Sequence, residues 1–237
     1  MAVTVEEVES WLFRRFIQAP GANLRLEDKK KAIEVAAFVS EIERLAPPGD
    51  LTLVDAAAGK GYIGLLAAER LPRARVTFIE RNGRVLDQAA AAAREAGIAD
   101  RCTFVTDDAG TGWPAEPSMA LALHACGPAA DTILAAAVAA RARRILVVPC
   151  CIPTFKRWER VADELGVKSA ALRRPLIDSL IGSERTLRLE AAGYATDIVP
   201  FVRPTVTPHN LLWRARKLGD PTRAAAAAAR LAELERR

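Results

Sequence analysis

The chain has 237 residues, 51% of them hydrophobic, which is enough for one sizeable domain with an appendage. No apolar run reaches the ~18–20 residues that cross a membrane, and the first residues lack a signal-peptide pattern, so we expect a cytoplasmic protein without a membrane partner. Four cysteines in a chain of this size argue against a disulfide framework. The net charge of +5 is compatible with RNA binding, and equally with the arginine-rich composition of a high-GC genome.

Two helices are predicted before the first strand. Apolar residues recur at helical spacing over 5–17, and Pro20-Gly21 interrupts that pattern. A second helical pattern covers 27–45 and stops before Pro47-Pro48-Gly49. We expect residues 1–48 to form a helical cap over the sheet that follows.

From residue 51 onward, strands alternate with helices, which predicts a parallel sheet with right-handed crossovers. A late pair of strands, 194–202 and 210–216, favours an antiparallel hairpin at the edge of that sheet. We therefore predict an α/β, Rossmann-like domain over residues 49–218, with seven strands that are mostly parallel. The other expected strands are 51–55, 75–80, 102–105, 119–124 and 144–148. Three helices are expected between them: one that begins after Gly61, one over 85–97 and one over 131–141.

The remaining segments have weaker patterns. Residues 151–188 look like the least regular part of the second half. Residues 219–237 form a tail whose alanine-rich helix, 223–237, has little apolar periodicity. We expect that helix to be exposed, frayed or packed on a partner.

The stretch from Val54 to Gly64 carries the strongest functional signal. The spacing Gly59-x-Gly61-x-x-Gly64, after a strand and before a helix, is typical of loops that bring the backbone close to a nucleotide. Glu80 ends the next apolar run, where an acid that binds ribose hydroxyls is expected. Dinucleotides and S-adenosylmethionine (SAM) both use this arrangement.

Asp55 distinguishes the two ligands. It ends the strand ahead of the glycines, where its carboxylate would repel a diphosphate. SAM carries an amino group and a sulfonium, and a carboxylate suits both. The sequence therefore favours SAM, with an NAD(P)-dependent oxidoreductase as the alternative.

We expect several residues at these strand ends to contact SAM. Asp55 would bind the methionine amino group, directly or through water, and Gly59 and Gly61 would let the loop pass close to the methionine moiety. Glu80 would accept hydrogen bonds from both ribose hydroxyls, and Arg81 would lie near the adenine edge. The alternatives are a carboxylate that interacts with a helix dipole at Asp55 and a surface acid at Glu80.

A histidine and three cysteines stand at the ends of the fourth and fifth strands. His124 would act as a base, orient the acceptor or contact the cofactor, unless it is a structural histidine. Cys126 and Cys150 are the other catalytic candidates. Side chains alternate along a strand, so Cys150 and Cys151 converge poorly on one zinc ion, and we predict no metal site.

The block Asp55-x-Ala57-x-Gly59-x-Gly61 resembles the first motif of class I SAM-dependent methyltransferases, with Ala57 in the place of the usual first glycine. The resemblance implies that Ala57 belongs to the cofactor site. It also implies an acid after the third strand that binds the adenine amino group. Asp108 is our first choice for that acid and Asp107 the second, and either one is also a good turn residue.

His-Ala-Cys-Gly at 124–127 and Pro-Cys-Cys at 149–151 are more distinctive. With the first motif they resemble a methyltransferase group that includes the glutathione S-transferase C-terminal-domain-containing proteins and the ribosomal-RNA-adenine-dimethylase-domain-containing proteins. The acceptor-stem tRNA ribose methyltransferases are more distant. The resemblance covers roughly residues 25–217 and implies a class I fold and SAM. In that group an aromatic–His pair often follows the two cysteines, whereas this chain has Ile152-Pro153 there. A catalytic role assigned to that histidine in the group therefore does not carry over to this chain.

We predict a SAM-dependent methyltransferase that acts on RNA, either rRNA or tRNA. The alternatives are a small-molecule or protein acceptor and a non-catalytic RNA-binding protein with the same fold. Arg185 and Arg188, one helical turn apart, and His209 are expected at the pocket mouth, where they would hold a phosphate or carboxylate of the acceptor. A solvated basic face is the other interpretation of the two arginines.

Overall fold

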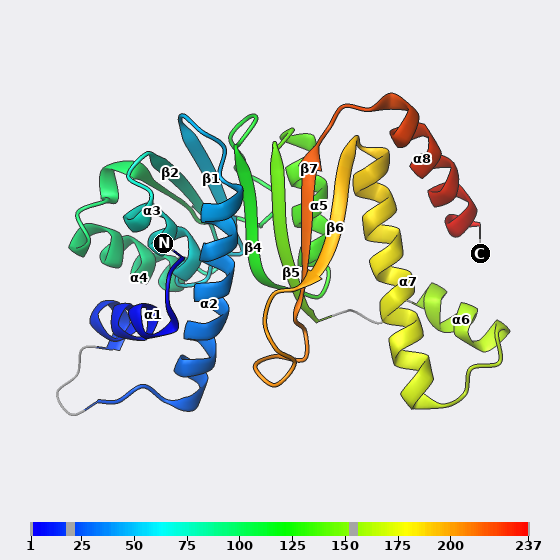
Figure 1. The fold of residues 1–237 in the computed structure, drawn as a ribbon, viewed down its shortest axis with the longest axis horizontal. Helices are drawn as coiled ribbons and strands as arrows, with labels where there is room; N and C mark the ends of the chain where they lie inside the picture. The colour runs from blue at the N-terminus through cyan, green and yellow to red at the C-terminus, as the bar shows by residue number, and fades with distance from the viewer. Residues whose placement is uncertain (1, 18–21, 152–155, 237) are drawn as a thin grey trace.

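A seven-stranded sheet forms the centre of the molecule, in a computed structural model that describes residues 2–17, 22–151 and 156–236 (Figure 1). The strand order is β3-β2-β1-β4-β5-β7-β6. The strands are β1 (Leu51–Ala56), β2 (Ala74–Ile79), β3 (Cys102–Val105), β4 (Met119–Cys126), β5 (Arg144–Cys151), β6 (Tyr194–Pro200) and β7 (Leu211–Lys217).

Helices connect and cover these strands. They are α1 (Val5–Leu12), the π-helical turn η1 (Phe13–Ile17), α2 (Leu26–Leu45), α3 (Tyr62–Arg70), α4 (Gly83–Glu95), the 3-10 turn η2 (Ala99–Arg101), α5 (Ala129–Ala139), α6 (Lys156–Glu164), α7 (Ala170–Ala191) and α8 (Pro221–Glu235). None of the described helices combines the length and hydropathy that a bilayer crossing requires.

The pairing of the strands confirms the predicted fold class. β1 pairs in parallel with β2 and β4, and the next neighbours β3 and β5 continue the parallel arrangement. β7 is antiparallel to both β5 and β6. A dinucleotide-binding sheet continues in parallel to its sixth strand, so the inserted β7 separates this fold from that class.

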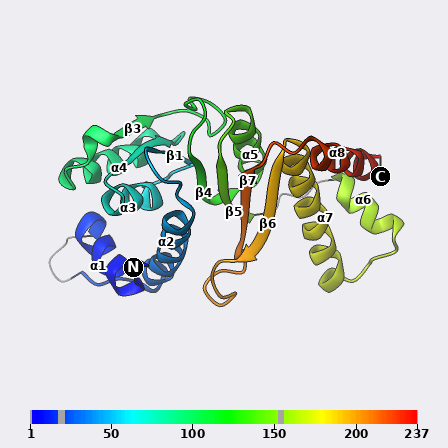
Figure 2. The same ribbon diagram turned by 45° about the horizontal axis from the view of Figure 1, so that its top comes forward.

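The two faces of the sheet have separate cores because alternate side chains of a strand point to opposite faces. Leu53 and Phe78 pack with apolar residues of α2, α3 and α4. Val54 and Ile79 pack with apolar residues of α5 and with Leu189 of α7. The helices α2 and α5 lie on opposite sides of the central strands (Figure 2). Parallel strands that are covered on both faces explain the nearly continuous apolar runs in the sequence.

The N-terminal helices lie against α3. Glu69 of α3 accepts a hydrogen bond from the Trp11 indole at 2.9 Å and forms an ion pair with Arg15 at 3.2 Å. Phe16 meets the ring of Tyr62 edge-on, with 4.7 Å between the ring centroids. These contacts place η1 next to the loop that joins β1 to α3.

The prediction for residues 151–188 was wrong. Most of that segment is helical, as α6 and the 22-residue α7. Pro175 lies inside α7, where proline removes a backbone donor and usually indicates a break. The buried stripe of the helix, which includes Ile177, Ile181 and Leu189, also contains Arg185, so the apolar period is interrupted.

The tail helix α8 packs on its own chain. Arg223 pairs with Glu190 of α7 at 2.9 Å, and Glu235 pairs with Arg188 at 3.2 Å. Ala227 is buried in this contact, while most of the helix surface is exposed. The tail helix is thus largely exposed, as one of the expected alternatives had it, and is held to α7 by these two ion pairs.

Candidate active site

The loop between β1 and α3 turns through left-handed backbone conformations. Gly59 and Gly61 have φ angles of 55° and 72°, and Ala57 has φ 55°. A non-glycine residue in this region costs roughly 1 kcal/mol, so Ala57 is a strained substitute for the usual glycine. The turn brings the backbone of the loop to the carboxyl end of β1, where a nucleotide-like ligand would lie against it.

Gly64 has a packing role. A Cβ atom at this position would clash with the Phe78 ring and would lie 2.9 Å from Asp55 Oδ2. Glycine thus lets α3 approach β1 and β2 closely, which is the part played by the third glycine of this motif.

Glu80 holds the loop from the end of β2. Its two carboxylate oxygens accept hydrogen bonds from the backbone N–H groups of Gly59 and Asn82, each at 3.0 Å. A carboxylate has about four lone-pair positions, so after these two hydrogen bonds Glu80 can accept about two more, one on each oxygen. Glu80 can therefore bind a ribose diol while it supports the glycine loop.

Asp55 lies beneath the loop. Only 1% of its surface is exposed, and its Oδ2 accepts the Gly64 N–H at 3.1 Å. Burial raises the pKa of Asp55 to about 8, the Gly64 N–H opposes that shift, and the charge of Glu80 adds to it. The structure therefore shows Asp55 at the N-terminal end of α3, and its contact with the methionine amino group stays a prediction.

These residues fit SAM as a ligand. The Glu80 carboxylate flanks the glycine loop and favours a cationic ligand over an anionic diphosphate, and the buried Asp55 beneath the loop adds to this preference where it is ionised. The left-handed Gly59 and Gly61 leave room for close approach, since a Cβ at Gly59 would meet no atom within 4 Å.

The adenine-side candidates are exposed. Asp107 Oδ1 accepts the Asp108 N–H at 2.7 Å, and Asp108 Oδ1 accepts the Gly110 N–H at 3.0 Å. Both acids thus support the turn after β3, and the assignment of either one to the adenine amino group stays a prediction. Arg81 is exposed directly after Glu80, so its place near the adenine stays a prediction as well.

His124 has an unusual backbone at the end of β4. Its φ angle is 66°, and the pairing with β5 shifts register between Leu123 and Ala125. Such a bulge re-aims a side chain at the cost of local strain. The imidazole Nε2 then reaches Glu34 Oε1 of α2 at 2.8 Å.

Glu34 is the site residue that the sequence analysis missed. It is buried on α2, and Lys31 approaches its other oxygen at 2.6 Å. Burial alone would raise the pKa of Glu34, but the hydrogen bonds from His124 and Lys31 outweigh it and lower that pKa. A lone acid on an otherwise apolar helix face was the available signal, whereas its partner, about 90 residues away in the chain, left no pattern.

The cysteine candidates cannot be placed by their side chains. The side chains of Cys126, Cys150 and Cys151 lie outside the described residues, as do Ile152 and Pro153, although the backbone pairs Cys126 with Cys151. Their predicted roles stay predictions. In the described part of the chain, no group of three His, Cys, Asp or Glu residues is arranged to hold a metal.

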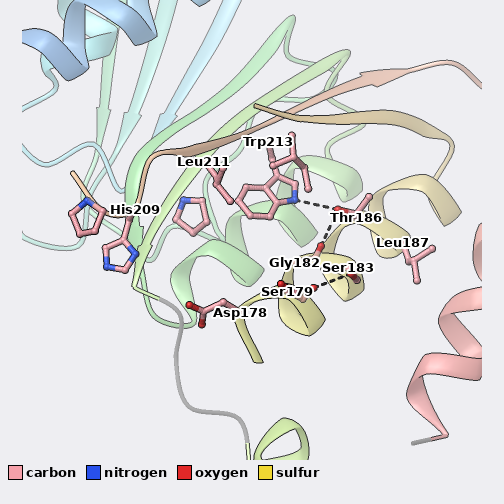
Figure 3. A pocket seen from close by; sticks show the side chains of 12 residues that line it. Asp178, Ser179, Gly182, Ser183, Thr186, Leu187, His209, Leu211 and Trp213 are labelled. Carbon is pink, nitrogen blue, oxygen red and sulfur yellow. Dashed lines mark hydrogen bonds between the residues drawn. The ribbon is translucent and has the colours of Figure 1, made fainter. Parts of the chain in front are cut away.

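The acceptor-side candidates border two cavities. One, of about 640 Å³, lies between α7 and β7 next to Pro149 of β5, and His209 stands at one end of it (Figure 3). Trp213 forms part of its apolar wall and donates a hydrogen bond to Thr186 at 3.3 Å.

Arg185 and Arg188 line a second cavity, of about 510 Å³, on another side of α7. Arg185 is buried and forms a two-point ion pair with Asp131, while Arg188 is exposed and pairs with Glu184 and Glu235. The two arginines share a face as expected, but His209 does not lie with them. Their substrate contacts stay predictions.

A family model described as a methyltransferase domain matches residues 28–157, more than half of the chain. The chain belongs to this methyltransferase domain family. The matched residues include the glycine loop, Glu80 and His124 of the candidate site.

Curated relatives match over a similar region. A glutathione S-transferase C-terminal domain-containing protein of Mus musculus is 33% identical over 192 residues, which cover 70% of this chain and 30% of the relative. The protein of the same description from Xenopus laevis is 26% identical over 208 residues, covering 76% and 33%. The chain thus spans about a third of the length of the curated relatives it matches.

A solved structure shares the whole fold. The magnesium protoporphyrin IX methyltransferase of Synechocystis, with bound SAH, aligns over 90% of this chain and 99% of its own, with a TM-score of 0.52 and 14% identity. The family model confirms the predicted methyltransferase domain, and the shared fold is that of the class I methyltransferases, a class whose methyl donor is SAM. The relation to the adenine-dimethylase-domain proteins and the acceptor-stem enzymes stays a prediction.

Proposed function

We propose that this methyltransferase holds SAM across the carboxyl ends of β1, β2 and β3 and methylates an RNA acceptor beside His124. The observation that carries the proposal is the glycine loop held by Glu80 at the end of two adjacent strands. In open α/β sheets, ligands bind at this edge.

The donor side follows from charge and geometry. SAM supplies, when bound, a methyl group on a positively charged sulfur. Glu80 would bind the ribose, and Gly59 and Gly61 would lie against the methionine moiety. Asp55 would act from beneath the loop, through its charge or through water. Asp107 or Asp108 would reach the adenine from the turn after β3.

The acceptor side is built around His124. Methyl transfer needs an in-line arrangement of acceptor, carbon and sulfur, so the protein mainly supplies alignment. A proton that leaves the acceptor could be taken by the imidazole, and the Glu34 carboxylate would stabilise the resulting cation. Cys126 and Cys150 remain candidates for the same edge of the sheet.

RNA is favoured by the charge next to the glycine loop. A cavity of about 360 Å³ opens beside Tyr62, and its lining contains three cations: Arg25, which pairs with Asp28, Lys31, which pairs with Glu34, and Lys60. A cationic patch beside an aromatic ring suits the phosphate and the base of a single-stranded nucleotide.

A small-molecule acceptor is the second candidate. The cavity of about 640 Å³ has an apolar wall that includes Trp213 and Leu211, faced by the hydroxyls of Ser179 and Ser183 (Figure 3). An apolar pocket with a few polar groups at the strand ends is typical of small-ligand sites.

Methyl transfer from radiolabelled SAM to RNA, protein and metabolite fractions of a strain that lacks the protein tests the proposal. We expect label in RNA with the wild-type protein and none with Glu80→Ala. Label only in the metabolite fraction would favour the second candidate. No label in any fraction, despite SAM binding, would contradict catalysis, and calorimetry that shows tight NADH binding without SAM binding would contradict the donor site.

A further inference from the structure

A small cavity with four arginines in its lining opens at the end of the sheet opposite the glycine loop. It lies where β5 and β6 begin and where β7 and α2 end, and its volume is about 280 Å³. The charged residues of its lining are Arg44, Arg144, Arg214, Arg216 and Asp197. None of its lining residues belongs to the glycine loop or to the cavities beside α7, so methyl transfer does not account for this cluster.

Two of the arginines stand directly opposite each other on neighbouring antiparallel strands. Arg144 of β5 and Arg216 of β7 are register partners, and both line the cavity. Like charges at directly opposite positions destabilise a sheet. In the part of the chain that the structure describes, no acid forms an ion pair with either of them.

The acids near the cavity are engaged by the other two arginines. Arg44 pairs with Glu41 at 2.8 Å, and Arg214 pairs with Glu41 at 2.9 Å and with Asp197 at 3.6 Å. Four arginines thus face two acids, which leaves an excess of two positive charges. That excess belongs to the unpaired residues, Arg144 and Arg216.

Arg144 is half-buried in this position. Burial lowers the pKa of Arg144, and the positive charges of Arg216 and Arg44 lower it further. A guanidinium nevertheless stays charged at neutral pH. The fold therefore holds a partly desolvated cation among like charges, and a bound anion would relieve that repulsion.

The size and charge of the cavity indicate the ligand class. Its volume is just below the roughly 300–1,000 Å³ of pockets that enclose a whole small molecule, so it suits a single ionic group. The short side chain of Ala195, opposite Arg216 on β6, leaves space for such a group. A terminal phosphate carries close to two negative charges at neutral pH, and the guanidinium fork matches its oxygens.

We propose that Arg144 and Arg216 bind a terminal phosphate group at this end of the sheet. The group belongs either to a free phosphate monoester or to the 5′ end of an RNA, and both present the same dianion. The site itself is independent of the methyl acceptor, and only the RNA source rests on the proposed function.

Thermal unfolding of the full-length protein at pH 7.5, in sodium phosphate and in sodium chloride of equal ionic strength, tests the site. At phosphate concentrations ten times the dissociation constant, the unfolding temperature of the wild type should rise by about 3 °C more than that of Arg144→Gln or Arg216→Gln. Arg75→Gln, which alters an exposed arginine of β2 outside the cavity, should keep the full wild-type gain and so measures the general stabilisation by phosphate. In chloride, Arg144→Gln should unfold no lower than the wild type, since the repulsion is removed.

The same phosphate gain in the wild type and in both cavity variants would overturn the proposal. So would a gain that Arg75→Gln loses as they do. If Arg144→Gln fails to fold, Arg216→Gln carries the test, because Arg216 is exposed.

Fluorescence anisotropy with one single-stranded RNA, 5′-phosphorylated or 5′-hydroxyl, distinguishes the two sources. About tenfold tighter binding of the phosphorylated RNA, lost in Arg216→Gln, would assign the site to an RNA end, since a charged hydrogen bond contributes that order of affinity. Equal binding of the two RNAs, together with the phosphate gain, would assign it to a free phosphate monoester. Absence of methyl transfer to RNA alongside an intact phosphate gain would count against the proposed function alone.

Discussion

At the scale of single residues, two positions under the glycine loop constrain each other. Gly64 has no room for a side chain because Phe78 and Asp55 fill the space in front of it. Asp55 in turn is buried away from solvent, and its carboxyl group accepts a hydrogen bond from one backbone N–H, that of Gly64. This local arrangement holds α3 against the sheet and thereby sets the position of the loop.

Gly64→Ala should lower the free energy of unfolding by about 1–3 kcal/mol, because the added methyl group must displace the Phe78 ring or shift α3. Urea unfolding measures the change. Gly83→Ala is the matched control, since a Cβ there meets Thr106 at an ordinary 3.4 Å and α4 gains a better helix former. Equal effects of the two substitutions would contradict the packing role of Gly64.

The ligand-free protein should lose stability as the pH rises because of Asp55. The folded pKa of about 8 lies above the unfolded value of 3.8, so the folded state binds the proton more tightly. The stabilisation is present below pH 4 and is lost progressively up to about pH 8, with a slope on the order of 1.4 kcal/mol per pH unit. Asp55→Asn should remove this dependence, as chemical unfolding between pH 5 and 8 would show. Parallel profiles of the two proteins would refute it.

At the scale of elements, a pair of polar side chains joins the cap helix α2 to the strand β4 at the sheet edge that holds the candidate site. The bulge in β4 turns His124 toward Glu34, which is held in place by burial and by Lys31 on the preceding helical turn. The helix α2 is therefore part of the candidate active site as well as a cover for the sheet.

Glu34→Gln should lower kcat by about 100-fold if His124 acts on the acceptor, because the neutral amide no longer stabilises a charged imidazole. The dissociation constant for SAM should stay within twofold, since Glu34 is absent from the glycine loop. Glu41→Gln, which alters an acid of the same helix that pairs with Arg44 and Arg214, serves as the control. Single-turnover kinetics and calorimetry measure both quantities, and an unchanged kcat would exclude the positioning role of Glu34.

At the scale of the whole molecule, the chain carries a net charge of +5, and many of its cations pair with acids, as Arg70 does with Glu43 and Arg173 with Glu159. Beside the glycine loop, Arg25 pairs with Asp28 and Lys31 pairs with Glu34, while Lys60 lines the same cavity. Under the proposed function, Lys60 is therefore the cation of this cavity that we expect to attract an RNA phosphate.

RNA binding should weaken with salt, and Lys60→Gln should reduce the slope of log K against log salt by about 1, as expected for one lost phosphate contact. Fluorescence anisotropy with a single-stranded RNA at several salt concentrations measures the slope. Lys217→Gln, on β7 at the other end of the sheet, is the control. An identical slope for wild type and Lys60→Gln would remove Lys60 from the RNA site.

The order of the strands, the helices before β5, the turn at Gly59–Gly61 and the acid that follows β2 were predictable from sequence, because each is encoded by neighbouring residues. The period of apolar residues indicates which face of a helix or strand is buried, and glycine indicates backbone conformations that other residues avoid. The long helix α7 was missed for the same local reason, since Pro175 and the buried Arg185 interrupt its period.

Only the tertiary structure shows which residues from distant segments of the chain are in contact. Asp55 faces α3 rather than open solvent, Glu34 meets His124, and Arg185 pairs with Asp131 away from His209. A charged side chain is buried only where the fold brings it a partner, and local sequence does not encode that partner. The sequence by itself therefore determined the fold class and favoured SAM over a dinucleotide, while packing decided which acids and bases lie together.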